Sequence, residues 1–212
     1  PTPNIDQLAE EGITLTSFYS APTSTPARAM LFSGKDYHQV GVGTMPGWER
    51  GPQIGNPNYT GRLSFDVPIF PEILQENGYQ TMFTGKWYMG HWGEEPEYHP
   101  INRGFTNTDG VMLPGQDVLY LADEDGKHIS SFRPQDFTAP SNYTRNGERI
   151  GKFPSNAYST EYHTDTAINL LKQRDRSKPF YLAVSYIAVH CPLQAPDSVI
   201  DKYLDVYARG WD

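Results

Sequence analysis

A serine, a proline and an arginine at every second position are the residues best suited to chemistry in this chain. They are Ser24, Pro26 and Arg28, in the run Ser-Thr-Pro-Ala-Arg-Ala-Met-Leu-Phe-Ser-Gly. The proline and the helix formers after it predict a short helix, and Gly34 is suited to end it. Free N–H groups at the helix start favour a negative charge beside Ser24, and Arg28 lies one turn further on the same side. The pattern alone also fits a serine-capped helix with a solvated arginine.

Two further candidate residues follow predicted strands. Tyr79 to Thr84 is predicted to be a strand, with Lys86 in the turn at its carboxyl end. The apolar run from Phe180 to Ala188 is predicted to be a central strand covered on both faces, which ends at His190. Ligands of α/β sheets bind at such strand ends, where a lysine can stabilise an anion and an imidazole can transfer a proton. The alternatives are a solvated turn lysine and a core histidine.

Two segments resemble the signatures of the sulfatase family. The run from Ser24 to Gly34 is similar to the first signature, which reads Cys or Ser, x, Pro, x, Arg, a short spacer, Leu, x, Thr or Ser, Gly. The run Gly-Tyr-Gln-Thr-Met-Phe-Thr-Gly-Lys-Trp, which ends at Trp87, resembles the second signature at the expected distance. The resemblance is strongest to bacterial and fungal arylsulfatases and extends to Thr2–Asp6 and His190–Pro196.

The resemblance implies a modified nucleophile. In the family the Cys or Ser is oxidised to formylglycine; one hydroxyl of its hydrate attacks sulfur, and the other then loses its proton to eject sulfate. Ser24 is thus expected to be converted by a formylglycine-generating maturation enzyme, by a route that differs from that of the cysteine form. The resemblance also implies that Arg28 holds the hydrated aldehyde. Lys86 would grip a sulfate oxygen, and His190 would contact the sulfate and protonate the leaving oxygen.

One position departs from the family pattern. The family usually has histidine two residues after the lysine, whereas this chain has Tyr88. Tyrosine donates a hydrogen bond but is not a base near neutral pH, so removal of the second hydroxyl proton is not explained. His91 would substitute only if the turn bends back; a surface position is the alternative. His38 either lines the substrate pocket, as Tyr88 is expected to do, or packs beside it.

The resemblance implies a metal ion, usually Ca²⁺. Its carboxylate and amide ligands are expected on an opening strand and in a C-terminal half that lie outside these residues. From this chain only the oxygen derived from Ser24 is expected to bind the metal. Hard cations need several oxygen ligands, so the others must come from outside these residues. The spacing of Asp6, Asp36 and Asp109 does not cluster them, so we expect three surface carboxylates.

The elements that must position these residues alternate between helix and strand. This alternation predicts a layered α/β fold. The resemblance implies a mixed, mainly parallel central sheet flanked by helices, of the alkaline-phosphatase and sulfatase type and incomplete in this chain. Besides the elements above, we expect a helix after the N-cap Thr2, a strand over 13–19, a helix over 71–77, an amphipathic helix around 164–171 and a helix over 196–207.

Composition narrows the possible partners. The 212 residues carry a net charge of −8 and no lysine- and arginine-rich stripe, which argues against nucleic acid. No stretch is apolar enough to span a membrane, and the single cysteine, Cys191, excludes an internal disulfide. We expect residues 1–212 to be part of one sulfatase catalytic domain, and a periplasmic or secreted location is favoured over a cytoplasmic one.

The sequence therefore predicts hydrolysis of small-molecule sulfate esters, of the arylsulfatase kind, through a formylglycine derived from Ser24. One alternative is a phosphate or phosphonate ester hydrolase that uses the unmodified serine. Another is a catalytically silent relative that only binds sulfated ligands.

Overall fold

The fold is built on a five-stranded mixed sheet. The computed structural model describes residues 2–45, 47–90, 95–112, 119–122, 143–151 and 153–210. The strands are β1 (Gln80–Lys86), β2 (Asn107–Met112), β3 (Tyr143–Arg145), β4 (Glu148–Arg149) and β5 (Phe180–Ser185), in the order β4-β3-β2-β1-β5. The strand β1 pairs in parallel with both β2 and β5, whereas β3 and β4 join antiparallel at the other edge. This mixed α/β sheet is the predicted fold class.

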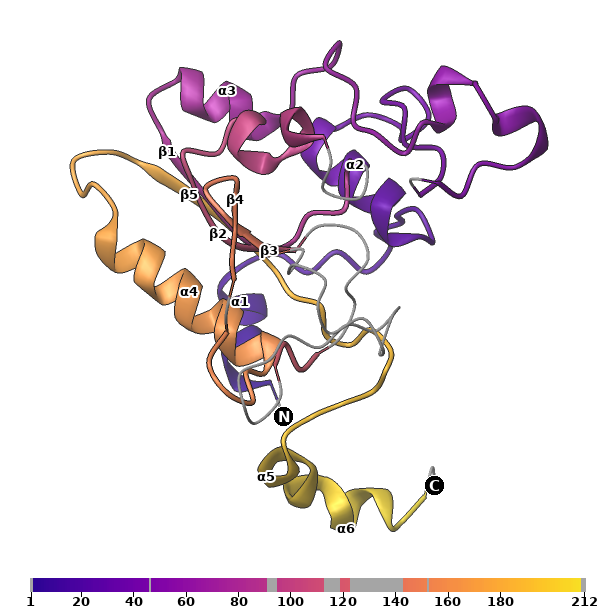
Figure 1. Ribbon diagram of the computed structural model, residues 1–212. Helices are drawn as coiled ribbons and strands as arrows, with labels where there is room; N and C mark the ends of the chain where they lie inside the picture. The colour runs from indigo at the N-terminus through magenta and orange to yellow at the C-terminus, as the bar shows by residue number, and fades with distance from the viewer. Residues whose placement is uncertain are drawn as a thin grey trace.

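Helices cover both faces of this sheet. The helices of the described chain are α1 (Pro3–Glu11), α2 (Ser24–Ser33), α3 (Phe70–Glu76), α4 (Ser159–Gln173), α5 (Asp197–Ile200) and α6 (Leu204–Tyr207), of which α2, α3 and α4 cover the sheet (Figure 1). Short 3-10 turns lie at η1 (Gly51–Gln53), η2 (Pro57–Tyr59), η3 (Pro96–Tyr98), η4 (Pro100–Asn102) and η5 (Asp201–Tyr203). Figure 1 shows α2 and α3 on one face and α4 on the opposite face, where α4 contacts β1, β2 and β5.

Two clusters of buried side chains hold these layers together. Beneath α2 and α3 the rings of Phe32 and Trp87 lie 5.3 Å apart, and those of Phe83 and Phe105 lie 5.2 Å apart. The second cluster, on the side of α4, includes Met112, Leu121 and Tyr143. Rings of this size bury large apolar areas, so the aromatic cluster fixes α2 against β1.

Most of the predicted elements are present. The helix after Ser24, the helix over 71–77 and the amphipathic helix around 164–171 correspond to α2, α3 and α4. Thr2 precedes α1, which has Pro3 at its first position. The expected C-terminal helix is broken into α5, η5 and α6. The strand β1 runs on to Lys86 rather than ending at Thr84, because Lys86 still pairs with Met112.

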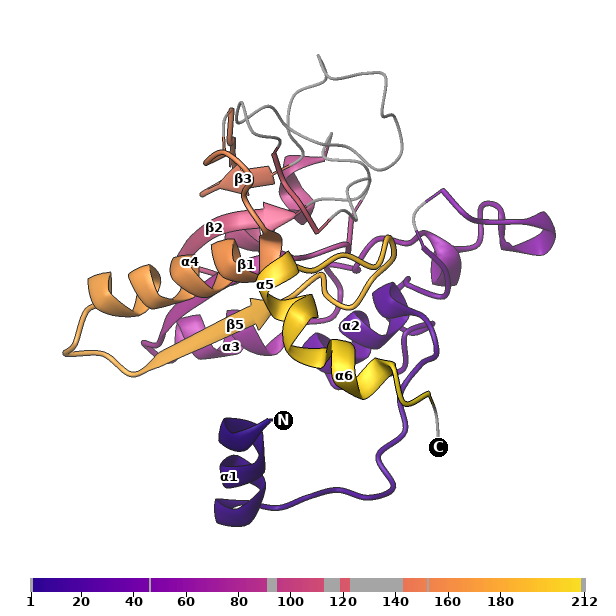
Figure 2. The same cartoon turned by 90° about the horizontal axis from the view of Figure 1, so that it is seen from below.

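The strand predicted over 13–19 is wrong. This segment is coil and turn, and all residues from 2 to 20 are exposed. A strand needs a partner for its backbone groups, and among the described residues none pairs with it. Figure 2 shows α1 and the chain that follows it lying apart from the sheet.

The prediction for 180–188 is wrong in two respects. The strand β5 ends at Ser185, and it lies at the edge of the described sheet rather than at its centre. Phe180 is 43% exposed and the other residues of β5 are half-buried, because β1 is the one described strand that pairs with β5. An apolar run does not reveal how many neighbours a strand has, because its composition reports burial and not pairing.

Among the described residues, no helix has the length and apolar character needed to cross a membrane.

A buried histidine links α4 to the sheet and predicts a pH dependence of stability. His163 is fully buried, its Nδ1 lies 3.1 Å from Thr84 Oγ1, and burial lowers the pKa of His163 to about 4. The unfolded chain therefore binds a proton below the ordinary histidine pKa of 6.5 that the folded chain does not. The contribution of neutral His163 to the free energy of unfolding is complete above pH 6.5. It falls by about 3 kcal/mol as the pH drops to 4.

Urea unfolding of the full-length protein between pH 4 and 7.5 measures this loss. The variant His163→Asn is less stable at every pH but has a flatter dependence in that window, because its amide does not titrate. Equal pH slopes for the two proteins would contradict the assignment.

Candidate active site

The predicted nucleophile lies at the first position of α2. Thr23 is extended, with ψ of 145°, and the helix begins at Ser24. Pro26 is buried in the first turn, and Gly34 ends the helix with φ of +66° while its N–H donates to the carbonyl of Met30 at 2.8 Å. These are the predicted start and stop of the helix. Ser24 is exposed, so the described residues leave its hydroxyl accessible.

Arg28 connects this helix to two strand ends. Its Nη1 donates to the main-chain oxygen of Lys86 at 2.8 Å and also to Ser185 Oγ. Lys86 ends β1 and Ser185 ends β5, so one guanidinium joins α2 to the carboxyl ends of neighbouring parallel strands. The structure thereby brings Arg28 and Lys86 together at the sheet edge where α/β folds bind ligands.

A glycine allows β1 and β5 to meet at this point. Gly85 lies opposite Ser185 in the register and has φ of +103°. A Cβ at Gly85 would overlap the carbonyl oxygen of Ser185, and any side chain at this φ would be strained. Glycine before the lysine is thus required by the close approach of the two strands.

Lys86 is a buried lysine, not a solvated turn residue. Its side chain is 4% exposed, and its Nζ lies 4.3 Å from the centre of the Tyr88 ring. Tyr88 is 8% exposed and has φ of +59°, a left-handed conformation that is uncommon for an aromatic residue. Tyr88 therefore lies next to Lys86.

The two candidate histidines lie apart from this contact. His190 is exposed in the loop five residues beyond the end of β5, and its Nδ1 lies 2.6 Å from the carbonyl of Cys191. His38 is half-buried in the loop after α2, where its ring packs 4.3 Å from that of Tyr37. The described contacts join neither histidine to Arg28 or Lys86, and His91 lies outside the described residues.

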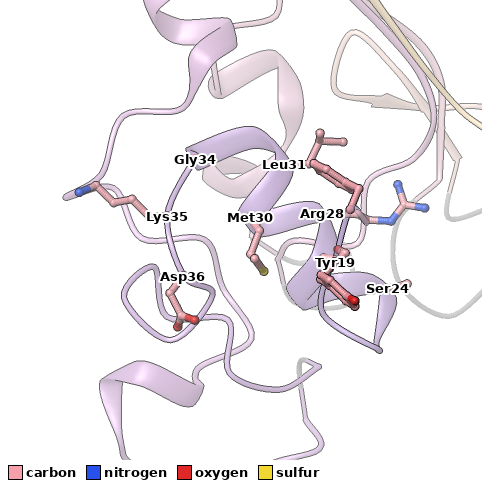
Figure 3. Close-up of a pocket in the computed structure, with 11 residues that line it drawn as sticks. Tyr19, Ser24, Arg28, Met30, Leu31, Gly34, Lys35 and Asp36 are labelled. Carbon is pink, nitrogen blue, oxygen red and sulfur yellow. The ribbon is translucent and has the colours of Figure 1, made fainter. Parts of the chain in front are cut away.

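A cavity of about 690 Å³ opens beside α2. Its walls include Ser24, Arg28, Tyr19, Met30 and Asp36. Figure 3 shows Ser24 and Arg28 on one side and Asp36 beyond Gly34 on the other. The backbone N–H and ring of His38 donate to Asp36 and lower the pKa of that carboxyl group, so it stays ionised. The cavity walls near Ser24 thus combine apolar side chains with a fixed cation, Arg28, and an ionised carboxylate, Asp36.

Three residues near the site, Ser185, Tyr19 and Met30, were not predicted from the sequence. Ser185 lies inside an apolar run, and no local signal marks it as a partner of Arg28. Tyr19 and Met30 belong to segments predicted to be strand and helix, in which nothing indicates a ligand. These three residues become relevant only because the fold places Ser185 against Arg28, and Tyr19 and Met30 in the same cavity wall as Ser24.

The described residues do not form a metal site by themselves. Among them, no three His, Cys, Asp or Glu side chains lie together in a way that could hold an ion. Asp6 accepts a hydrogen bond from Thr2, and Asp36 pairs with His38. Asp109 pairs with Arg145 at 3.0 Å and is partly buried between the strands, so it is not the surface carboxylate expected. These residues do not fit a complete calcium site.

Comparison with known proteins gives one family for the whole chain. The sulfatase family profile matches residues 1–212. An uncharacterized sulfatase of Schizosaccharomyces pombe is 38% identical over 215 residues, which cover 100% of this chain and 37% of that protein. An arylsulfatase of Klebsiella aerogenes is 32% identical over 215 residues, covering 100% of this chain and 42% of that enzyme. The chain thus spans about two fifths of the length of these relatives.

Solved structures have the same fold. The crystal structure of Ps i-CgsB in complex with k-i-k-neocarrahexaose superposes with a TM-score of 0.72 at 28% identity, over 97% of this chain and 43% of that one. A structure determined with D-glucosamine-2-N,6-O-disulfate gives a TM-score of 0.65 at 26% identity, over 96% of this chain and 33% of that one. With both signatures placed at neighbouring elements of this fold, the chain belongs to the sulfatase family.

Proposed function

We propose that this chain forms part of the catalytic domain of an enzyme that hydrolyses sulfate esters through a formylglycine derived from Ser24. The observation that carries the proposal is the bond from Arg28 to the main chain of Lys86. It joins the helix that begins at Ser24 to the strand that ends at the buried lysine, within a chain of the sulfatase family.

Residue 24, Arg28 and Lys86 have different chemical roles in the proposed reaction. A hydrated formylglycine would supply a geminal diol as nucleophile. The guanidinium of Arg28 keeps its charge at all relevant pH values, so it provides fixed donors beside residue 24. The ammonium of Lys86 is buried, and a charge in such a site stabilises a sulfuryl oxygen more strongly than it would in water.

Proton transfer to the leaving oxygen is assigned to His190. An imidazole can donate a proton to a leaving oxygen, and the loop of 186–196 that carries His190 continues from β5 beyond Ser185. In the described chain this loop is largely exposed, and the Tyr158 hydroxyl donates to the carbonyl of Gln194 at 3.2 Å. The proposal requires His190 to turn toward Lys86 when a sulfate ester is bound.

The proposed function includes a calcium ion and a maturation enzyme because the family resemblance implies both. Ser24 is the one residue of this chain assigned to the metal, and the other ligands would come from polypeptide outside these residues. Pro26 and Arg28 would be recognised by the maturation enzyme before the domain folds, because in the folded chain Pro26 is buried and Arg28 bonds to the main chain of Lys86.

Small sulfate esters are the proposed substrates. The name arylsulfatase of the Klebsiella relative favours an aryl sulfate as the first probe. The sulfated sugar held by one similar structure makes a sulfated sugar the second.

Mass spectrometry of the peptide that contains Ser24, combined with an aryl sulfate assay, tests this function. The full-length protein, produced with a maturation system for serine-type sulfatases, is expected to show a Ser24 peptide lighter by two hydrogens and turnover of the ester. Ser24→Ala should be inactive. An unmodified serine that hydrolyses a phosphate ester would favour the alternative hydrolase, and sulfate binding without turnover would favour a silent relative.

A further inference from the structure

The residue two positions after Lys86 faces its ammonium group. Lys86 Nζ lies 4.3 Å from the centre of the Tyr88 ring, inside the range in which a cation is attracted to an aromatic face. Both side chains are buried, at 4% and 8% exposure. The attraction is stronger at such a desolvated site than at the surface.

The main chain holds the tyrosine in this position. The Trp87 N–H donates to the carbonyl of Met112 at 3.0 Å, and the Trp87 indole Nε1 donates to the carbonyl of Tyr98 at 2.7 Å. Trp87 packs in the cluster beneath α2, whereas Tyr88 packs in the cluster on the α4 side. Successive residues are thus anchored on opposite faces of the sheet.

The left-handed backbone at Tyr88 directs the ring. Its φ of +59° is costly for an aromatic residue and persists only where the surroundings impose it. Packing with Met112 and Ile187 in the buried cluster supplies that constraint. The ring is therefore a rigid surface beside the flexible four-carbon stem of Lys86.

A lysine needs such support to act as a fixed charge. Its ammonium sits on several rotatable bonds, and ordering these bonds during the reaction costs conformational entropy. A ring that already holds the ammonium at the end of β1 removes this cost before the substrate arrives. The phenol is a poor base near neutral pH, so proton abstraction does not explain a tyrosine at this position.

Resting on the sulfatase activity proposed above, we propose that Tyr88 is a positioning residue that holds the Lys86 ammonium against its ring face for the sulfate group. The ring carries this role, and the hydroxyl takes no proton in the reaction. Tyr88 thereby differs in kind from a histidine at the same position, because it acts through Lys86 rather than on the nucleophile.

Two variants of Tyr88 separate the ring from the hydroxyl. Tyr88→Phe keeps the ring face and should retain kcat/KM for an aryl sulfate within about twofold, with an unchanged pH profile. Tyr88→Leu keeps an apolar side chain without the face and should lower kcat/KM about tenfold. Inhibition by inorganic sulfate should weaken in the Leu variant alone, because Lys86 then binds the anion less tightly.

A matched control removes an aromatic ring beneath a different cation. The Arg174 guanidinium lies 5.0 Å from the ring of Phe180, at the opposite end of β5 from Ser185. Phe180→Leu should leave kcat/KM and sulfate inhibition unchanged. Thermal unfolding of each full-length variant shows whether a loss of activity follows from a loss of fold.

Several results would overturn the positioning role. They are a Leu variant with the kinetics of the wild type, a Phe variant as impaired as Leu, or a Phe variant that loses one limb of the pH profile. If the Leu variant does not fold, an impaired Phe variant or a changed Phe pH profile still rejects the role. A wild-type protein without aryl sulfate turnover would instead reject the proposed function, whereas wild-type turnover with an unaffected Leu variant rejects only the role of Tyr88.

Discussion

Lys86→Ala is expected to lower kcat/KM for an aryl sulfate by about a thousandfold in the full-length protein. Lys86 is 4% exposed and is the last residue of β1, where Arg28 bonds to its main chain, so its charge acts in a site from which water is largely excluded. Removal of one such preorganised group leaves the negative charge that develops on sulfate without its buried ammonium partner. Steady-state kinetics with an aryl sulfate measures the loss.

The matched control for this prediction is Lys172→Ala. Lys172 lies in the exposed last turn of α4 and carries the same charge, but it takes no part in the strand-end contact. Its removal should leave kcat/KM within about twofold. If both variants were equally active, the place of Lys86 in the reaction would be rejected.

Arg103→Ala is expected to cost about 3–5 kcal/mol of unfolding free energy, because it breaks a buried ionic network. The Arg103 side chain is 1% exposed, and its Nε lies 2.7 Å from Glu72 Oε1. Its Nη1 donates to the carbonyl of Leu63 at 2.8 Å, and the guanidinium lies over the ring of Phe65 at 4.5 Å. The network ties α3 to the loop before it, and urea denaturation measures its loss.

Arg62→Ala is the comparison for the buried arginine. Arg62 also forms an ion pair, with Glu95 at 2.7 Å, but about 30% of its side chain remains exposed. Water can replace part of this interaction, so the expected cost is about 1 kcal/mol. Similar losses for the two variants would show that the burial of Arg103 does not determine its contribution.

The sequence by itself determined the local elements that carry the chemistry. The helix after Ser24 begins and ends as predicted because proline, helix formers and glycine act over a few neighbouring residues. The strand before Lys86 and the amphipathic face of α4 were predicted for the same reason. The two sulfatase signatures are also local patterns, and the family they predicted is confirmed over the whole chain.

Only the tertiary structure decided which of these elements meet. Arg28 contacts Lys86 and Ser185 across 58 and 157 residues, and no local pattern encodes such a pairing. The left-handed turn at Tyr88 arises where Trp87 packs in one buried cluster and Tyr88 in the other, and the edge position of β5 depends on which strands lie beside it. Local preference depends on near neighbours in the sequence, whereas pairing and burial depend on segments that only folding brings together.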